Sequence, residues 1–236
     1  MRIKFLLLII AILLVLISGC GNPSFPENRS DIESSLADSP LSAICINTLR
    51  KTYITNSHAD SFVQVDYPQI QTDQNDYKSI NEEIAAMVPL FVVSTYGEDY
   101  HGLTLEMDYT VYTYMGKWIS VVFEGIGNVQ DTAHPTNILF SLNFDLVTGS
   151  RVALSDIFPI DSSTVQKLRE AYSSDDYKAE WLQEIPDIQL LELLQNSDRL
   201  FGNTYSYFTS EGLYVSLQAP HAIGDHVEFR IPDFVI

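Results

Sequence analysis

Cysteine and basic residues are both scarce in this sequence of 236 residues. It contains two cysteines, Cys20 and Cys45, and 13 Lys and Arg residues against 31 Asp and Glu, which gives a formal net charge of −18. Proteins that bind nucleic acid do so largely through Lys and Arg on the phosphate backbone, so this balance excludes a general nucleic-acid-binding protein. A strongly acidic surface favours solubility and speeds the encounter with cationic partners.

The sequence also lacks the common motifs of cofactor-dependent and hydrolytic enzymes. There is no G-x-x-x-x-G-K phosphate loop, no H-E-x-x-H, no C-x-x-C and no G-x-S-x-G. Gly125-Ile126-Gly127 has no third glycine to complete a dinucleotide-binding fingerprint. We therefore expect no cofactor, no metal site and no catalytic residue, and a chain that is not an enzyme.

The one long apolar run, Phe5–Ile17, is too short to span a membrane, because a spanning helix takes about 20 apolar residues. It follows the positive residues Arg2 and Lys4 and leads through small residues to Cys20, which is the arrangement of a secretory signal. The stretch Ile17-Ser18-Gly19-Cys20 resembles a bacterial lipobox. That resemblance implies cleavage before Cys20 and lipidation of its thiol by diacylglycerol, with fatty acids such as palmitate. The protein is then anchored at the outer face of the bacterial cell membrane. The alternative is an uncleaved membrane anchor.

Composition divides the chain into a signal peptide, a tether and one module. Residues 1–19 form the signal peptide, and residues 20–43 are rich in Ser, Pro, Asn and Asp and predict a flexible tether. The patterns that follow predict one module with an N-terminal α+β half over residues 44–160 and a C-terminal half over residues 161–236. Cys45 has no disulfide partner if Cys20 carries lipid, so we expect packing alone to stabilise the module.

Hydrophobic periodicity predicts an α+β fold, with an antiparallel meander sheet packed by helices and a C-terminal half of helices and strands. Alternation in residues 103–114 and 117–126 predicts a long antiparallel hairpin. Apolar residues at helical spacing in residues 80–91 predict a helix with one buried face, which Pro89 is expected to bend or end. In the C-terminal half, residues 162–196 are typical of three helices, and strands follow them.

The loop Ser94–Gly102 combines tyrosines with acidic residues, which is typical of a contact surface. Tyr96 and Tyr100 offer rigid, partly apolar area, while Glu98 and Asp99 offer negative charge to a basic partner. The alternative for the tyrosines is ordinary packing, because the chain contains 13 of them.

The histidines provide the only candidates for chemistry. His221 and His226, with Asp225 between them, form the one close pair, and two imidazoles with a carboxylate can make a metal or acid–base site. The alternative is an ordinary loop before the last strand. His134 precedes a proline, so we expect extended backbone there, with the side chain either in a site or in a structural role.

Three segments of the module share the motifs of a known family in the family's order. They are "YPQI…INEEI", "AHPTNILFSLNFDLVTGSRVALSDIF" and "FTSEGLYVSLQAPHAIGDHVEFRIPDF", which lie between Phe62 and Phe234. The most specific matches are Ala133-His134-Pro135, Phe144-Asp145, Thr148-Gly149, Leu154 with Asp156 and Phe158, Glu211-Gly212-Leu213 and Ile231-Pro232. These segments resemble the paired extracytoplasmic domains of unknown function of families 4163 and 3298. That pair occurs in the lysozyme-sensing anti-sigma-V factor and N-terminal to some peptidoglycan deacetylases.

The resemblance implies an extracytoplasmic α+β module with wall-directed or lysozyme-directed binding. It does not carry over the two specialised roles of the family. We expect neither sigma-factor control nor deacetylation, because the sequence shows no sigma-binding segment before the module and no deacetylase domain after it.

Together these patterns predict a lipid-anchored, non-catalytic binding module of the bacterial envelope. Lipid on Cys20 holds it to the membrane, and its partner is a cationic protein such as lysozyme, or peptidoglycan. One alternative is a small cell-wall hydrolase that uses His134 or the cluster of His221, Asp225 and His226. Another is a structural envelope lipoprotein whose partner is a membrane protein.

Overall fold

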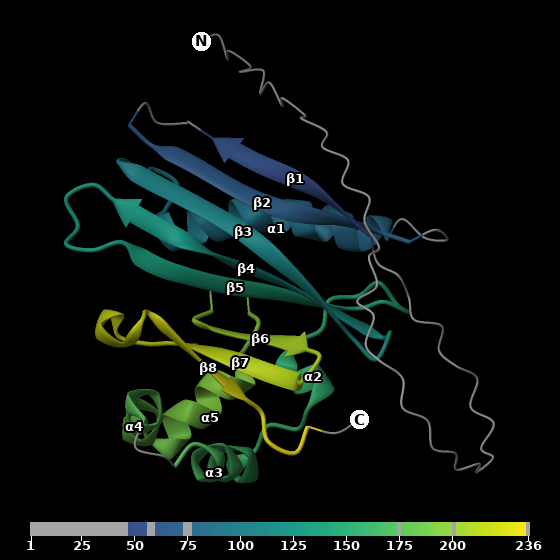
Figure 1. Cartoon of the computed structure of the whole chain (residues 1–236), viewed down its shortest axis with the longest axis vertical. Coiled ribbons are helices and arrows are strands. Elements are labelled where there is room, and N and C mark those ends of the chain that lie inside the picture. Colours follow the sequence, from purple (N-terminus) through teal and green to yellow (C-terminus); the bar gives the residue numbers. More distant parts are fainter. Residues whose placement is uncertain (1–46, 56–59, 73–76, 174–175, 200–201, 235–236) are drawn as a thin grey trace, which may run out of the picture.

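The computed structural model describes residues 47–55, 60–72, 77–173, 176–199 and 202–234. The predicted signal peptide, Cys20, the tether and Cys45 lie outside these residues. The α+β class is confirmed, because the described residues form a five-stranded sheet, a three-stranded antiparallel sheet and five α-helices (Figure 1). None of the described helices is both long and apolar enough to cross a membrane.

The five-stranded sheet has the order β1-β2-β3-β4-β5 and is mixed. Its strands are β1 (Asn47–Thr55), β2 (Phe62–Gln71), β3 (Leu103–Tyr114), β4 (Trp118–Val129) and β5 (Thr136–Asp145). Neighbouring strands are antiparallel except β2 and β3, which run parallel. This pair departs from the predicted antiparallel meander. The reason is the 19-residue helix α1 (Lys78–Tyr96), which carries the chain back along the sheet, so that β3 starts at the same end as β2.

Helix α1 covers one face of the five-stranded sheet, and the side chains of β3 alternate accordingly. Leu103, Leu105 and Met107 are buried in the core that includes α1, whereas the residues between them are exposed. The predicted apolar face of α1 is buried. Pro89 does not end this helix, which continues to Tyr96. We call the opposite face of the sheet the outer face.

The three-stranded sheet has the order β6-β7-β8 and packs with the C-terminal helices around a second core. Its strands are β6 (Thr204–Thr209), β7 (Gly212–Gln218) and β8 (His226–Arg230). The helices are α2 (Leu154–Ile157), α3 (Ser162–Ala171), α4 (Tyr177–Glu184) and α5 (Asp187–Gln195), with the short 3-10 helix η1 (His221–Ile223) before β8. This core also includes Trp118 and Leu154, so both halves of the module contribute to it.

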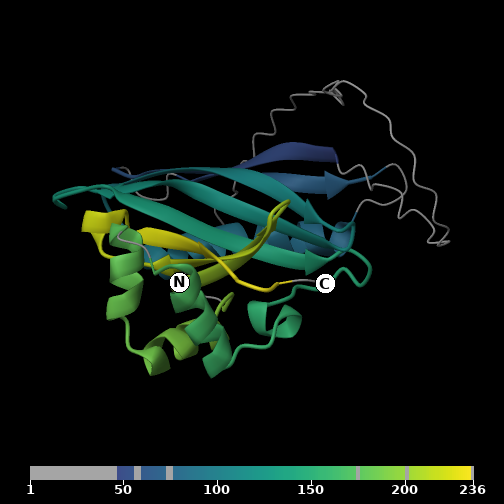
Figure 2. The ribbon, with the colours of Figure 1, turned by 60° about the horizontal axis from the view of Figure 1, so that its bottom comes forward.

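The unpaired edge of β6 lies against β4 and β5. Figure 2 shows the smaller sheet, in yellow and green, next to the larger one. Phe208 N donates to Ser120 Oγ at 2.8 Å, and Asn143 Nδ2 donates to Ser206 O at 2.8 Å. Asp198 Oδ1 accepts from Ser206 N at 2.6 Å. An edge strand ordinarily leaves such backbone groups open to another chain. In this structure, the side chains of Ser120, Asn143 and Asp198 form hydrogen bonds with backbone groups of β6. We call this contact the β6 seam.

Candidate functional site

The outer face of the five-stranded sheet is buried at one end and open at the other. Near the β3–β4 turn, Ser120 and Val122 are buried, with exposed fractions of 0 and 3 %. Further along β4, on the same face, Glu124 and Ile126 are exposed. We call this exposed end, over β1 to β4, the open face.

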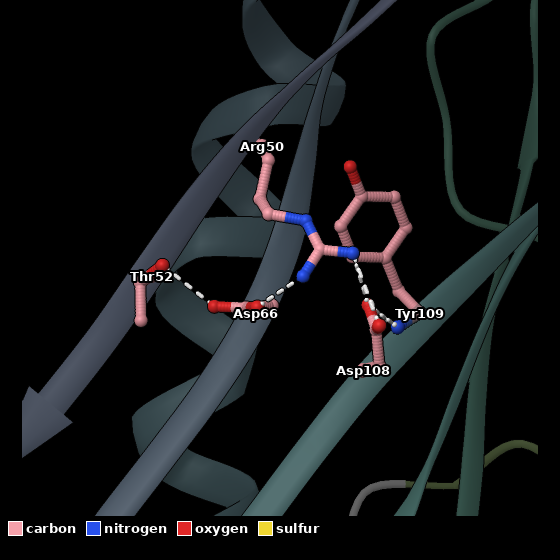
Figure 3. A network of polar contacts seen from close by, with 5 residues as sticks. All are labelled: Arg50, Thr52, Asp66, Asp108 and Tyr109. Atoms are coloured by element: carbon pink, nitrogen blue, oxygen red, sulfur yellow. Dashed lines mark hydrogen bonds and ion pairs between the residues drawn. The ribbon is translucent and has the colours of Figure 1, made fainter. Parts of the chain in front are cut away.

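An ion-pair network crosses three strands of the open face (Figure 3). Arg50 of β1 donates from Nη1 to Asp66 of β2, and from Nη2 to both carboxylate oxygens of Asp108 in β3 at 2.9 and 3.0 Å. Thr52 donates its hydroxyl to the other oxygen of Asp66 at 2.6 Å. The guanidinium carbon also lies 5.5 Å from the ring centroid of Tyr109. Two carboxylates and an aromatic ring therefore form a seat for a guanidinium group, which the chain's own Arg50 fills.

Burial differs along this network. The side chain of Asp66 is only 9 % exposed, whereas those of Arg50 and Asp108 are 53 and 61 % exposed. Partial burial acts to lower the pKa of Arg50, but the hydrogen bonds and charges of Asp108 and Asp66 outweigh it and raise this pKa above its ordinary value. Arg50 therefore stays cationic, and its half-exposed side chain pairs with the nearly buried carboxylate of Asp66.

The open face is hollowed beside the network. The hollow has a volume of about 600 Å³ and extends over β2, β3 and β4. The charged groups in its lining are the carboxylates of Asp66, Glu106, Asp108 and Glu124 and the guanidinium of Arg50. Four carboxylates against one cation make this surface attractive to a positively charged group.

Large apolar side chains are also exposed on the open face. Ile54, Phe62 and Ile126 are 55, 40 and 55 % exposed, and the strand register places all three on the outer face. Polar residues of β2 and β3 lie between them, since Ile54 pairs with Gln64 and Ile126 with Glu106. The combination of apolar and acidic side chains therefore suits a protein partner.

The predicted contact loop offers less surface than the sequence indicates. Glu98 and Asp99 are exposed, but Tyr100 is 8 % exposed and lies in the core shared with α1. Tyr100 is therefore part of the core, and its ring does not provide the contact area that the sequence indicated. Tyr96 is half-buried at the end of α1, and burial raises its pKa to about 12. A Cβ on Gly127 would lie 1.9 Å from Tyr96 Oη, so the glycine is needed for this tyrosine to pack on β4.

Three of the predicted residues around the histidines come together. The rings of His134 and His221 stack with centroids 4.9 Å apart, and His221 Nδ1 lies 2.9 Å from Asp225 Oδ1. Asp225 also accepts from the backbone N of Asn137 at 2.8 Å, which ties β5 to the turn before β8. His226 takes no part in this contact, since within the described chain its Nδ1 is buried without a hydrogen-bond partner. No group of three or more His, Cys, Asp or Glu among the described residues is placed to hold a metal ion.

Sequence reasoning missed the network of Arg50, Asp66 and Asp108. A signal was present in β3, where Glu106 and Asp108 alternate with buried apolar residues, the pattern of a strand with one solvated face. The position of Arg50 could not be read in this way, because its contact with Asp108 depends on the parallel pairing of β2 and β3.

Proteins similar to this chain are found only among solved structures. No protein-family model and no curated protein matches the chain. A DUF3298 family protein from Pseudomonas aeruginosa PAO1 has a TM-score of 0.49 and 12 % identity, over 80 % of this chain and 90 % of that chain. A member of the same family from Bacteroides fragilis has a TM-score of 0.47 and 12 % identity, with the same coverage. Both structural neighbours belong to one of the two families that the sequence motifs resemble.

Proposed function

We propose that this chain is a lipid-anchored, extracytoplasmic binding module without catalytic activity, and that its open face binds a cationic protein. The observation that carries the proposal is the hollow of about 600 Å³, in which four carboxylates stand against one guanidinium. Charge complementarity of this kind steers the encounter with a basic partner and selects against acidic ones. The exposed apolar side chains beside it provide area that a protein partner covers.

Charge decides which partner suits the open face. A second copy of the chain has a formal net charge of −18 and brings like charges together, and anionic wall polymers are repelled for the same reason. A small basic protein is attracted. Lysozyme is such a protein. The anti-sigma-V factor, which contains the domains that the sequence motifs resemble, senses lysozyme. Lysozyme is therefore the first probe, and peptidoglycan is the alternative ligand.

Titration calorimetry of the full chain, purified in detergent, with lysozyme at two salt concentrations tests the proposal. We expect binding at low salt that weakens as salt rises, because exposed charges are screened over a Debye length of about 8 Å at physiological ionic strength. An acidic protein of similar size is the control and should not bind. Absence of lysozyme binding at low salt, or equal binding of both proteins, would contradict the proposal.

Matched charge variants locate the binding surface. Glu106→Gln and Glu124→Gln each remove a carboxylate from the hollow, whereas Glu170→Gln removes an exposed one from α3. Each hollow variant should weaken lysozyme binding about two- to fivefold, which corresponds to the roughly 0.5–1 kcal/mol of an exposed ion pair. The α3 variant should change affinity less than about twofold. Equal losses would mean that net charge, rather than the hollow, attracts the partner.

The anchoring part of the proposal rests on the apolar run and on Cys20. Cys20→Ala should abolish labelling by fatty acids and leave the uncleaved precursor, which runs larger on a gel. Labelling of the variant at the level of the natural chain, with no change in size, would show that Cys20 is not the lipid attachment site.

The histidine cluster supports a second candidate function, that of a small cell-wall hydrolase. The observation in its favour is that Asp225 lies at Nδ1 of His221, because a carboxylate in that position orients the ring and leaves Nε2 to act as a base. Release of soluble fragments from peptidoglycan is the assay. Loss of activity in His221→Ala and His134→Ala but not in the control His101→Ala would favour the hydrolase. Absence of activity in the natural chain would exclude it.

A further inference from the structure

The chain enters the five-stranded sheet at one end, and the turn between β3 and β4 lies at that same end. Asn47, the first residue of β1, pairs with Gln71, the last residue of β2. Because β2 and β3 run parallel, β3 ends on this side as well, and its turn at Met115 and Gly116 follows there. Figure 1 shows the start of β1 and the β3–β4 turn at the right of the view.

A second turn follows β5 and lies beside the first one. Leu146, directly after β5, donates its backbone N to Lys117 O at 2.7 Å. The turn then passes the start of α1, since a Cβ on Gly149 would lie 2.9 Å from Ser79 Oγ. We call the end of the sheet that carries Asn47 and these two turns the entry end.

Both turns of the entry end carry an apolar side chain that is exposed to solvent. Met115 is 57 % exposed and Val147 is 82 % exposed. The backbone at Val147 is fixed, because its N donates to Asp145 Oδ1 at 2.8 Å. Surface turns are ordinarily built from glycine and small polar residues. These two apolar side chains contribute little to the core and are available to a partner.

Met115 also has a backbone conformation that methionine does not favour. Its φ is 52° and that of Gly116 is 63°, so both central residues of the hairpin turn are left-handed. Asn and Asp are preferred at the first of these positions, because their short polar side chains tolerate it. The methionine therefore lowers the stability of the turn, and its exposed side chain gives little packing in return. Strain of this kind at a surface indicates a role in binding.

Two exposed lysines accompany the apolar side chains. Lys117 directly follows the β3–β4 turn, and Lys78 begins α1, where it forms an ion pair with Glu82 at 3.7 Å. The hollow of the open face lies toward the opposite end of the sheet, since its lining includes Thr104 at the start of β3 and Asn128 near the end of β4. The acidic hollow and the entry end are therefore separate surfaces.

We propose that the entry end lies against the phospholipid bilayer to which Cys20 anchors the chain, with Met115 and Val147 inserted at the interface. This inference rests on the lipid anchor of the proposed function. A bilayer is the occupant because the anchored chain enters the module at this end, which keeps the bilayer at a high local concentration. Lysines beside apolar side chains suit this interface, where ammonium groups reach the phosphates. The open face is then directed away from the membrane, toward a soluble partner.

Tryptophan substitutions in the full chain test this orientation. The chain is anchored in vesicles of phosphatidylcholine and phosphatidylglycerol with brominated acyl chains, which quench tryptophan only at short range, and the natural chain supplies the background of its two tryptophans. Met115→Trp and Val147→Trp should each add emission that the brominated lipid reduces at least about twofold, because interfacial side chains reach the acyl boundary. Ile126→Trp, on the open face, should add emission that the brominated lipid does not reduce.

Met115→Asn separates a role in binding from a role in folding. Asn suits the left-handed turn, so the melting temperature in detergent should be unchanged or higher. Quenching of Val147→Trp in the same chain should fall at least about twofold, because inserted apolar area is lost. Ile126→Asn is the matched control at the opposite end of the sheet, and it should leave the quenching of Val147→Trp unchanged.

Flotation of the natural chain with the vesicles distinguishes the anchor from the orientation. A chain that does not float would overturn the lipid anchor and this inference together. A chain that floats, with Met115→Trp and Val147→Trp quenched no more than Ile126→Trp, would overturn the orientation alone. A dimer in detergent that Met115→Asn dissociates, in a chain without quenching, would assign the two turns to a second copy instead.

Discussion

The two ends of β4 differ in how the outer face of the sheet is covered. On the outer face, alternate residues of β4 are buried near its start and exposed near its end. The buried ones are Trp118, Ser120 and Val122, and the exposed ones are Glu124, Ile126 and Asn128. The backbone geometry is the same at both ends, so side-chain chemistry decides which end the chain covers with its own elements.

Apart from the carboxylate of Asp198, the covered end uses neutral polar groups, whereas the open end uses charged ones. In the β6 seam, Ser120, Ser141 and Asn143 are buried and hydrogen-bonded. Neutral groups of this kind can be buried once paired, whereas an ionised carboxylate costs much more to remove from water. The carboxylates of Glu106 and Glu124 are therefore left exposed to water at the open end. A partner of opposite charge can compensate for the cost of burying them.

The largest expected effect comes from breaking the β6 seam. Asn143→Ala removes the donor to Ser206 O and the acceptor for Ser120 Oγ, so buried groups lose partners. We expect the free energy of unfolding to fall by about 2–4 kcal/mol, as measured by urea denaturation. Asn128→Ala at the open end should change it by less than about 0.5 kcal/mol. Similar losses in the two variants would remove the distinction between the two ends.

The one carboxylate in the seam makes stability depend on pH. Burial raises the pKa of Asp198 to about 6, against the opposing effect of the hydrogen bonds from Ser206 and Leu154. The folded state therefore binds a proton that the unfolded state, with an ordinary pKa of 3.8, does not yet hold. The contribution of Asp198 to stability should rise as pH falls from 7.5 through 6, and level off below 3.8.

The variant Asp198→Asn isolates this contribution. Urea denaturation from pH 7.5 to pH 5 should show a smaller gain in stability for Asp198→Asn than for the natural chain, because the amide does not titrate. An identical gain in both proteins would mean that relief of repulsion among the many surface carboxylates, rather than the seam, accounts for the pH dependence.

A smaller effect concerns Arg50 as the resident cation of the open face. Arg50→Gln empties the seat formed by Asp66 and Asp108, whereas Lys51→Gln makes the same charge change at the neighbouring position of β1, which faces the other way. We expect Arg50→Gln to strengthen lysozyme binding about two- to fivefold more than Lys51→Gln, the equivalent of one exposed ion pair. Calorimetry that gives the same affinity for both variants would show that Arg50 acts only through net charge.

The smallest expected effect is that of reductant. Both cysteines lie outside the described residues, so packing and hydrogen bonds hold the two ends of the sheet together in that part of the chain. The melting temperature should change by less than about 1 °C when a thiol reductant is added, because a lost disulfide typically costs about 2–5 kcal/mol and shifts melting far more. A larger decrease would reveal a covalent link.

Local pattern accounts for most elements of this fold. Alternation predicted the hairpin of residues 103–114 and 117–126, and the structure has strands at Leu103–Tyr114 and Trp118–Val129. Helical spacing predicted the buried face of α1 correctly. The parallel pairing of β2 and β3 was not predicted, because β3 alternates buried and exposed residues, a pattern typical of antiparallel strands.

The candidate sites were harder to predict because they depend on tertiary contacts. His134 and His221 were separate suggestions in the sequence, and the fold stacks them. Tyr100 looked like a loop residue beside Asp99, yet its ring is buried in the core. A local pattern shows which residue types are near one another in sequence, but burial depends on what the rest of the chain places above them.

The parallel pair β2–β3 also has a consequence for the order of folding. Phe62 lies opposite Thr104, whereas β3, β4 and β5 and then β6, β7 and β8 pair through short connections. Closing a long loop costs entropy before its contacts form, so pairs that are distant in sequence tend to form late. We expect β1 and β2 to dock onto a preformed β3–β4–β5 meander. The seat for Arg50 does not exist before that step, so the acidic hollow is among the last parts of the molecule to be assembled.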